Sequence, residues 1–291
     1  MKRLTFIRAA ITAAALAVAP AAFAAGAAPI PPSLSWTFSG PFGTYDNTQL
    51  QRGFKVFREV CAACHSAEYL AFRNLSQPGG PEFSAAQVKA LAAEYKVKAG
   101  PNDQGEMYER PARPADYWPS PFPNRQAAEA ANGGAYPPDM SVIAKARTYE
   151  RGFPWFVFDI FTQFQEQGPD YLAALLTGYV DAPAGVSVPA GKYYNTYFPG
   201  HIIAMPPPLN DGAVEYPKGP DGRPQVPETK AQYAKDVTAF LMWVAEPKLE
   251  QRKELGLKVM LFLLVFAGLL YFTKKKIWSK VAGHHARGPA F

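Results

Sequence analysis

Residues 46–65 read DNTQLQRGFKVFREVCAACH, and this stretch joins a helix signal to a cysteine motif. Asp46, Asn47 and Thr48 are residue types that cap helix N-termini. Beyond them, apolar side chains recur at steps of three and four residues, which is the period of an amphipathic helix. We therefore predict a helix that starts near residue 46 and carries the motif at its C-terminal end. The recurring residues are Leu50, Phe54, Phe57, Val60 and Cys61.

The motif is Cys61-Ala62-Ala63-Cys64-His65, and it holds the only two cysteines of the 291-residue chain. A structural zinc site needs four ligands, commonly with a second cysteine pair, and the sequence has no second pair. A thioredoxin-like redox motif follows a strand and opens a helix, whereas this motif ends a helical pattern. Covalent heme attachment uses this spacing. We therefore predict one heme c, with thioether bonds to Cys61 and Cys64 and with His65 as a ligand of the iron.

The ligand on the other face of the iron would decide the chemistry. An open position suits gas or peroxide chemistry, and a sixth protein ligand suits electron transfer. The candidates His201 and Met205 lie in NTYFPGHIIAMPPPLNDG, residues 195–212. Three prolines at 206–208 stiffen the backbone after Met205, which helps to hold a weak thioether ligand. A thioether also raises the heme potential. These features favour Met205 and leave His201 open.

The N-terminal residues 1–24 have a basic start, an alanine-rich apolar run and the small-x-small site Ala22-Phe23-Ala24. This pattern predicts a secretory signal peptide that is cleaved after residue 24. The alternative is an uncleaved membrane anchor, for which the apolar run is short. Cleavage would place the mature domain outside the cytoplasm.

A second apolar run, residues 255–272, lies near the C-terminus. At about 1.5 Å per residue it spans roughly 27 Å, close to the ~30 Å hydrocarbon core of a bilayer. Lysines 274–276 follow at once and mark the cytoplasmic side, which argues against a buried helix of a soluble core. We predict a single-pass membrane protein. Its parts are a periplasmic domain at 25–254, an anchor at 255–272 and a cytoplasmic tail at 273–291.

The net charge of +6 divides unevenly along the chain. Residues 1–24 hold three Lys and Arg residues and the segment from Leu255 onward holds six, with no acidic residue in either. The predicted periplasmic domain therefore has 21 cationic and 24 acidic residues, a net charge of −3. This balance gives no support to nucleic-acid binding. A mildly acidic domain could instead steer a basic partner protein.

Two further helices are predicted, over GPDYLAALLTGY at 168–179 and PETKAQYAKDVTAFLMWVAEP at 227–247, the second ended by Pro247. No strand alternates convincingly. The segment ERPARPADYWPSPFPN at 109–124 carries five prolines, so it can be neither a helix nor an inner strand. A large bound cofactor would supply apolar surface on which such loops could order.

Residues 148–168, TYERGFPWFVFDIFTQFQEQG, form an aromatic insert. One interpretation is a helix packed on the domain's own core. The other is a contact surface for lipid or for a partner subunit.

Five segments, in order over residues 34–280, resemble the cytochrome c1 family, the membrane-anchored heme subunits of cytochrome bc1 complexes, and the proteobacterial members in particular. The resemblance implies a mainly α fold. This would be a class I cytochrome c-like heme domain enlarged by Pro-rich loops, with one C-terminal transmembrane helix. The first and last helices of the domain would cross, Gly53 and Phe57 meeting Phe240 and Trp243. The segments are QRGFKVFREVCAACHS, NGGAYPPDMSVIAKAR, GPDYLAALLTGY, YYNTYFPGHIIAMPPPL and DVTAFLMWVAEPKLEQRKELG.

The resemblance implies a role for each matching residue. Cys61 and Cys64 match the thioether cysteines, and His65 matches the proximal iron ligand. Met205, in AMPPPL, matches the distal ligand. Arg147 matches an arginine that pairs with a heme propionate, as suits a guanidinium fork. Asn132 and Tyr171 match residues near the propionates and the heme edge. Pro137 and Pro138 match a wall of the pocket.

The implied function is a one-electron relay without bond chemistry of its own. A Rieske iron–sulfur protein, reduced by quinol at a cytochrome b subunit, would reduce the heme, which would then reduce a soluble periplasmic c-type cytochrome. The whole complex would be a dimeric quinol–cytochrome c reductase. The alternatives are a free-standing membrane-tethered electron carrier or oxidase heme subunit, and a five-coordinate heme sensor or peroxidase. Three features depart from the family pattern: the insert at 148–168 is long, Met140 stands where leucine is usual, and the additional cysteine pair of some bacterial members is absent.

Overall fold

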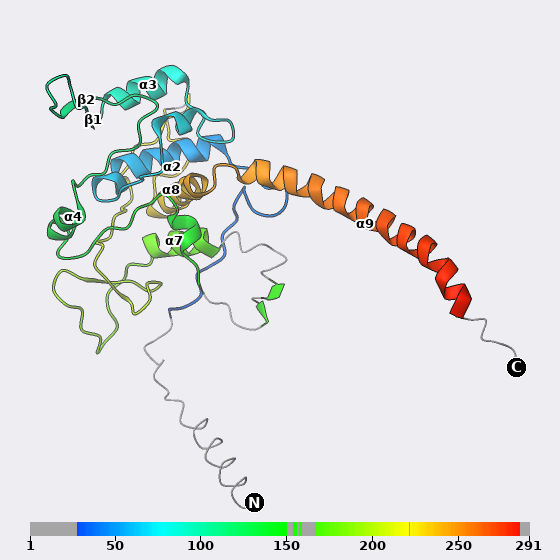
Figure 1. The fold of residues 1–291 in the computed structure, drawn as a ribbon. Coiled ribbons are helices and arrows are strands. Elements are labelled where there is room, and N and C mark those ends of the chain that lie inside the picture. The colour runs from blue at the N-terminus through cyan, green and yellow to red at the C-terminus, as the bar shows by residue number, and fades with distance from the viewer. Residues whose placement is uncertain (1–27, 150–153, 156, 159–166, 221, 286–291) are drawn as a thin grey trace, which may run out of the picture.

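The structure is a computed structural model that describes residues 28–149, 154–155, 157–158, 167–220 and 222–285. The predicted signal peptide at 1–24 lies outside the described residues, as does most of the aromatic insert. The domain is mainly helical, and a single long helix leaves it (Figure 1). Its helices are α2 (Asn47–Glu59), α3 (Ala85–Ala93), α4 (Arg125–Ala131), α5 (Ile143–Ala146), α7 (Gln167–Thr177), α8 (Lys230–Ala245) and α9 (Leu249–His285), with 3-10 turns η1 (Cys61–Ala63) and η2 (Phe72–Ser76).

Helix α2 begins where the sequence predicts. The Asp46 carboxylate accepts hydrogen bonds from the backbone N–H groups of Thr48 (2.9 Å) and Gln49 (3.1 Å), so it satisfies two donors that the helix leaves free. The α-helical backbone ends at Glu59, and the cysteines follow on a tighter turn. The predicted helix at 168–179 is confirmed as α7, and the one at 227–247 as α8.

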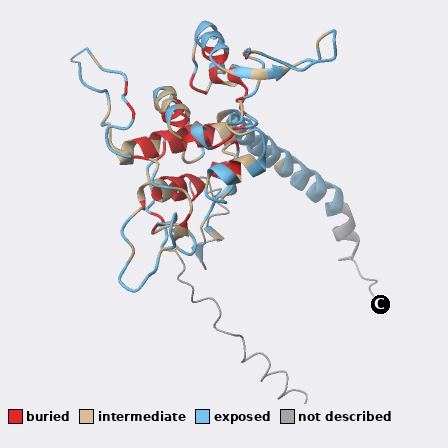
Figure 2. Cartoon of the chain, turned by 90° about the vertical axis from the view of Figure 1, so that its left-hand side faces the viewer, coloured by how far each residue is buried: buried red, intermediate tan, exposed pale blue. Residues whose placement is uncertain are grey.

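Helices α2 and α8 cross, and α7 packs against α8 (Figure 1). The buried residues gather on the helices at the centre of the domain (Figure 2). The crossing is close because Gly53 has no side chain. A Cβ built there would lie 2.1 Å from the Asp236 carbonyl oxygen and 2.7 Å from the Phe240 Cβ. The rings of Phe57 and Phe240 lie 5.5 Å apart. These contacts confirm the predicted crossing at Gly53, Phe57 and Phe240. Trp243, one turn further along α8, packs over Gly80.

Replacing Gly53 with alanine is expected to destabilise the domain by about 1–3 kcal/mol, because the added methyl forces two packed helices apart. Chemical denaturation of the purified protein would measure this as a lower unfolding midpoint. Gly256→Ala in α9 is the matched control, since a Cβ at Gly256 meets nothing within 4 Å. Equal midpoints for the two variants would contradict the close-crossing argument.

The described residues contain two short antiparallel hairpins that the sequence did not predict. Strands β1 (Lys96–Ala99) and β2 (Tyr108–Pro111) form one, and β3 (Tyr193–Tyr194) and β4 (Ile202–Ile203) form the other. Their residues are exposed or half-buried except Ile203, and the strands are only four or two residues long, too short for a clear alternating pattern in the sequence. Pro111 ends an edge strand, which is consistent with the exclusion of an inner strand at 109–124.

The Pro-rich segment is ordered partly by the domain's own aromatic core. Trp118, from this segment, is buried, and its ring lies 5.4 Å from Phe57, 5.3 Å from Phe72 and 4.8 Å from Tyr95. Its backbone N–H donates to the Leu70 carbonyl at 2.7 Å. Part of this irregular backbone therefore orders on side chains of the domain itself.

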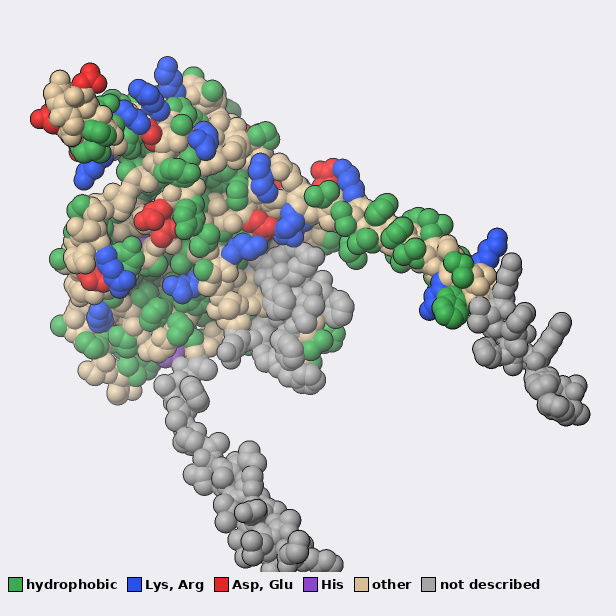
Figure 3. All heavy atoms as spheres, viewed as in Figure 1, with side chains coloured by type: hydrophobic (Ala, Val, Ile, Leu, Met, Phe, Trp, Pro, Cys, Tyr) green, Lys and Arg blue, Asp and Glu red, His purple; other side chains and the backbone are tan. Residues whose placement is uncertain are grey.

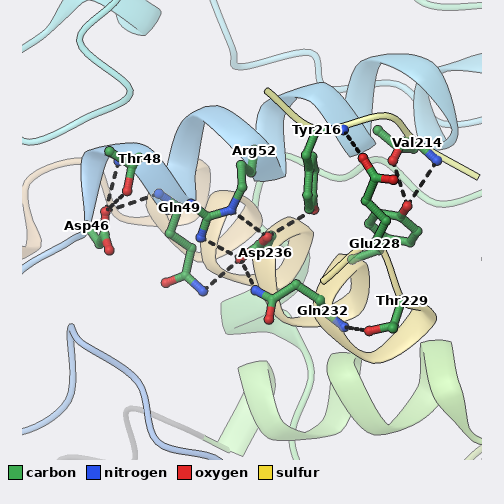
Figure 4. A network of polar contacts seen from close by, with 11 residues as sticks. Asp46, Thr48, Gln49, Arg52, Val214, Tyr216, Glu228, Thr229, Gln232 and Asp236 are labelled. Carbon is green, nitrogen blue, oxygen red and sulfur yellow. Dashed lines mark hydrogen bonds and ion pairs between the residues drawn. The ribbon is translucent and has the colours of Figure 1, made fainter. Parts of the chain in front are cut away.

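A polar cluster also crosses the α2–α8 interface (Figure 4). Asp236 in α8 is fully buried and accepts hydrogen bonds from Arg52 Nε (2.9 Å), Gln49 Nε2 (3.1 Å) and Gln232 Nε2 (2.9 Å). The Tyr216 hydroxyl donates to the same carboxylate at 2.9 Å. The cluster joins both central helices to the loop at 209–217, which follows the proline triplet.

Helix α9 extends away from the domain, and its apolar surface is visible between charged residues near both ends (Figure 3). The helix over residues 249–279 is long and apolar enough to cross a membrane. Its most apolar 18-residue window has a mean hydropathy of 2.3, and none of that window is buried. Its first turns are tied to the domain. The Tyr45 N–H donates to Glu250 (2.7 Å), and Lys253 Nζ donates to the Phe38 carbonyl (2.5 Å).

Candidate heme-binding site

The cysteine motif lies on a tight turn directly after α2. The N–H groups of Cys64 and His65 both donate to the Cys61 carbonyl, at 3.1 and 2.9 Å. Cys61 is buried and Cys64 is exposed. Burial, with the neighbouring Cys64, raises the pKa of the Cys61 thiol to about 12. A redox thiol of the thioredoxin type needs a lowered pKa, so the environment of Cys61 argues against that chemistry.

His65 is held as a neutral imidazole with one nitrogen free to bind metal. Its side chain is 8% exposed, and Nδ1 lies 2.8 Å from the Pro138 carbonyl oxygen. A carbonyl only accepts, so Nδ1 carries the proton and Nε2 carries the lone pair. Burial holds the pKa of His65 below its ordinary value, although the Pro138 carbonyl and Asp139 act in the opposite direction. This is the tautomer and charge state that an iron ligand needs.

Asp139 fixes the segment that follows the motif. Its carboxylate accepts from the Ser66 hydroxyl and the Glu68 N–H through Oδ2 and from the Ser141 N–H through Oδ1, each at 2.8 Å. Burial alone would raise the pKa of Asp139, but these hydrogen bonds outweigh it and lower the pKa. The carboxylate therefore stays ionised and ties the Pro138 segment to His65. Sequence reasoning missed this residue, although Asp-Met-Ser at 139–141 has the spacing of a local Asx turn.

Met205 lies two residues after β4, and its backbone is held by Tyr179, which follows α7, and by the β3–β4 hairpin. The Tyr179 hydroxyl donates to the Met205 carbonyl at 3.1 Å. Asn195 is fully buried, and its amide donates to the Leu175 carbonyl in α7 at 2.8 Å. The turn before Met205 contains His201 at a φ of 62°, its ring stacked on Tyr194. The His201 ring therefore packs within the β3–β4 hairpin, and which of the two residues binds iron stays a prediction.

Arg147 and Tyr171 lie near each other. Arg147 follows α5, and Gly168 at the start of α7 lets α5 approach closely, since a Cβ there would lie 1.8 Å from the Ala144 carbonyl oxygen. Burial raises the pKa of Tyr171, and the positive charge of Arg147 acts in the opposite direction. The Arg147 side chain itself is exposed. The structure thus brings together two of the residues assigned to the propionates.

Asn132 and the two prolines lie on the path from α4 to Asp139. Asn132 caps the C-terminus of α4, where its side-chain amide donates to the Ala128 carbonyl at 2.7 Å. Pro137 is half-buried and Pro138 is exposed, and the Pro138 carbonyl receives the His65 hydrogen bond. Pro138 therefore acts on the site through its backbone.

Two alternatives for the motif find no support. A structural zinc site needs four ligands, and within the described residues no group of three or more His, Cys, Asp or Glu side chains could hold a metal ion. The motif follows helix α2 rather than a strand, which is not the thioredoxin arrangement. The residues present instead fit a covalently bound heme. They are two thiols on one turn, a neutral imidazole beside them, and a thioether on a separate braced loop.

A cavity of about 640 Å³ lies elsewhere, between α2, α3 and the loop near Pro217. It shares no residue with the candidate heme site. Its cationic residues are each ion-paired, Arg52 with Asp236, Lys55 with Glu59 and Arg58 with Glu94. The paired charges give no reason to assign an anion to it.

Comparison with known proteins agrees with the site. The model of the Cytochrome C1 family matches residues 36–281. The chain is 62% identical over 250 residues to cytochrome b/c1 of Bradyrhizobium diazoefficiens, covering 86% of this chain but 36% of that protein. It is 51% identical to cytochrome c1 of Blastochloris viridis, over 85% of this chain and 86% of that protein. It is 45% identical to cytochrome c1 of Rhodospirillum rubrum, over 84% of this chain and 86% of that protein. With matches over most of its length and a site that fits a bound heme, this chain belongs to the cytochrome c1 family.

Proposed function

We propose that the chain is the heme c-carrying, electron-transfer subunit of a cytochrome bc1 complex, which is an oxidoreductase. The observation that carries the proposal is the neutral imidazole of His65, fixed on the Pro138 carbonyl beside two cysteines on one turn. Family membership supports the same function. Relatives from potato are named cytochrome c1 heme proteins.

Four residues of this chain would hold the heme. Cys61 and Cys64 would bind the porphyrin through thioether bonds, and His65 Nε2 and Met205 Sδ would bind the iron. When bound, the heme supplies a one-electron couple between ferric and ferrous iron. With His65 and Met205 both bound to the iron, the heme would pass electrons without any bond being made or broken.

The surrounding residues would tune and orient the group. Arg147 would pair with a propionate, with Tyr171 beside it. Asn132 would lie near the heme edge, and Pro137 and Pro138 would form part of the pocket wall. The Tyr179 hydrogen bond to the Met205 carbonyl would limit movement of the thioether loop, which favours the ligated state of a weak ligand.

The partners follow from the complex. A cytochrome b subunit and a Rieske iron–sulfur protein would lie on the donor side, and the relative named cytochrome b/c1 supports the first of these. The acceptor would be a soluble periplasmic c-type cytochrome, and the complex would be a dimer. The net charge of −3 on residues 25–254 supports a basic acceptor, whose reduction would slow as salt rises.

The topology of the chain would be that of a single-pass protein of the bacterial inner membrane. Residues 1–24 would be a cleaved signal peptide and 25–254 the periplasmic heme domain. Residues 255–272 would cross the lipid, and 273–291 would lie in the cytoplasm. The exposed apolar surface of α9 and the lysines beyond it support this arrangement.

Purification from membranes tests the function. We expect the chain to retain its heme in acid-acetone and to co-purify with a cytochrome b and an iron–sulfur protein. A pigment that acid-acetone extracts would remove the thioether assignment. Isolation with covalent heme but without a cytochrome b would favour the membrane-tethered carrier, and ready carbon monoxide binding by the reduced native protein would favour the five-coordinate sensor or peroxidase.

A further inference from the structure

The turn at residues 39–44 places an exposed phenylalanine beside the start of α9. Four aromatic residues lie in or next to this turn, and three of them are buried: Trp36, Phe38 and Tyr45. The fourth, Phe42, is 76% exposed. A domain that buries three of these rings and leaves the fourth outside gives reason to ask what covers Phe42 in the assembled protein.

The base of the turn is firmly held. The Phe38 ring packs 5.3 Å from Trp36 and 5.4 Å from Tyr45. The Thr44 N–H donates to the Thr37 carbonyl at 3.0 Å and closes the turn. Trp36 Nε1 donates to the buried Asp170 at 2.8 Å, which ties the segment to α7. The exposure of Phe42 is therefore a property of a fixed turn.

The contacts of the turn set its level along α9. Tyr45 N–H contacts Glu250, and Lys253 Nζ contacts the carbonyl oxygens of Phe38 (2.5 Å) and Gly43 (3.3 Å). The turn thus lies beside the first turns of the helix, as Figure 1 shows. Lys253 precedes the apolar run by two residues, a rise of about 3 Å. Phe42 is consequently placed at the level where α9 becomes apolar.

We infer that the turn at 39–44 is a membrane-contact surface, with the Phe42 ring inserted into the lipid interface beside α9. The occupant is lipid because Phe42 is placed at the level where the apolar run of α9 begins, and none of the most apolar window of α9 is buried within the described residues. An aromatic side chain at the headgroup level is a common anchor. Together with the Lys253 contacts, it fixes the tilt of the domain on the bilayer. The inference rests on the proposed anchoring by α9.

Photocrosslinking in native membranes tests it. Phe42→p-benzoylphenylalanine keeps an aromatic ring at the turn, and irradiation followed by mass spectrometry identifies what lies against it. Tyr117→p-benzoylphenylalanine is the matched control, because Tyr117 is also exposed but lies on the Pro-rich segment. We expect phospholipid adducts at 42 to exceed those at 117 severalfold.

Other outcomes overturn the inference. A crosslink from 42 mainly to another protein subunit would show that protein covers the turn, and adducts no more frequent than at 117 would show that water does. The same crosslinker, p-benzoylphenylalanine, at Phe262 and at Leu264 on different sides of α9 tests the anchor separately from the turn. If neither gives a lipid adduct, membrane anchoring fails, whereas adducts there without adducts at 42 refute only the contact of the turn.

Discussion

Replacing Met205 with leucine is expected to lower the midpoint potential of the heme on the order of 0.2 V, within the ~0.8 V range over which axial ligands tune heme. The thioether favours ferrous iron, and leucine has no donor atom to replace it. The turn around residue 205 should persist, because Tyr179 binds the backbone carbonyl rather than the side chain. Redox titration gives the potential. Carbon monoxide binding by the reduced variant shows whether the iron coordination position assigned to Met205 has become open.

Met140→Leu is the control for this substitution. Met140 is also half-buried, and its N–H donates to the Ser66 carbonyl at 2.8 Å, so it lies close to His65 in the chain's fold. A volume-conserving change there should leave the potential unaltered and the reduced heme closed to carbon monoxide. If Met205→Leu behaved like Met140→Leu, the iron ligand would have to be sought elsewhere, with His201 next.

The helices could be predicted from the sequence because their signals are local. Asp46 as a cap, the spacing of Leu50, Phe54 and Phe57, and Pro247 as a stop all act within a few residues. The cysteine motif is equally local, since five consecutive residues define it. The crossing of α2 and α8 is a long-range contact, and only the family resemblance supplied it.

The supports of the site could not be predicted in the same way. Asp139 and Asp236 are ordinary acidic residues in sequence, and their roles depend on partners brought by folding from 73 and 184 residues away. Pro138 binds His65 through its backbone carbonyl, a group that every residue has, so the residue type does not predict this contact. The placement of Trp118 against Phe57 likewise depends on how an irregular segment folds back.

Replacing Asp236 with alanine is expected to cost about 3–5 kcal/mol of unfolding free energy, because it leaves the guanidinium of Arg52 buried without its partner. The Arg52 side chain is only 13% exposed, so water can replace little of the lost interaction. The Tyr216 hydroxyl loses its acceptor as well, which frees the loop after the proline triplet. Chemical denaturation of the heme-loaded protein would measure the loss.

Two companion variants separate charge burial from other causes. Glu59→Ala breaks an exposed ion pair with Lys55 on the same helix and should cost no more than about 0.5 kcal/mol. Arg52→Met combined with Asp236→Ala removes both charges, so the cost should fall below the sum of the single changes by about 0.5–3 kcal/mol. Strict additivity would instead mean that Asp236 stabilises the crossing through its other partners, Gln49, Gln232 and Tyr216, and that Arg52 contributes little.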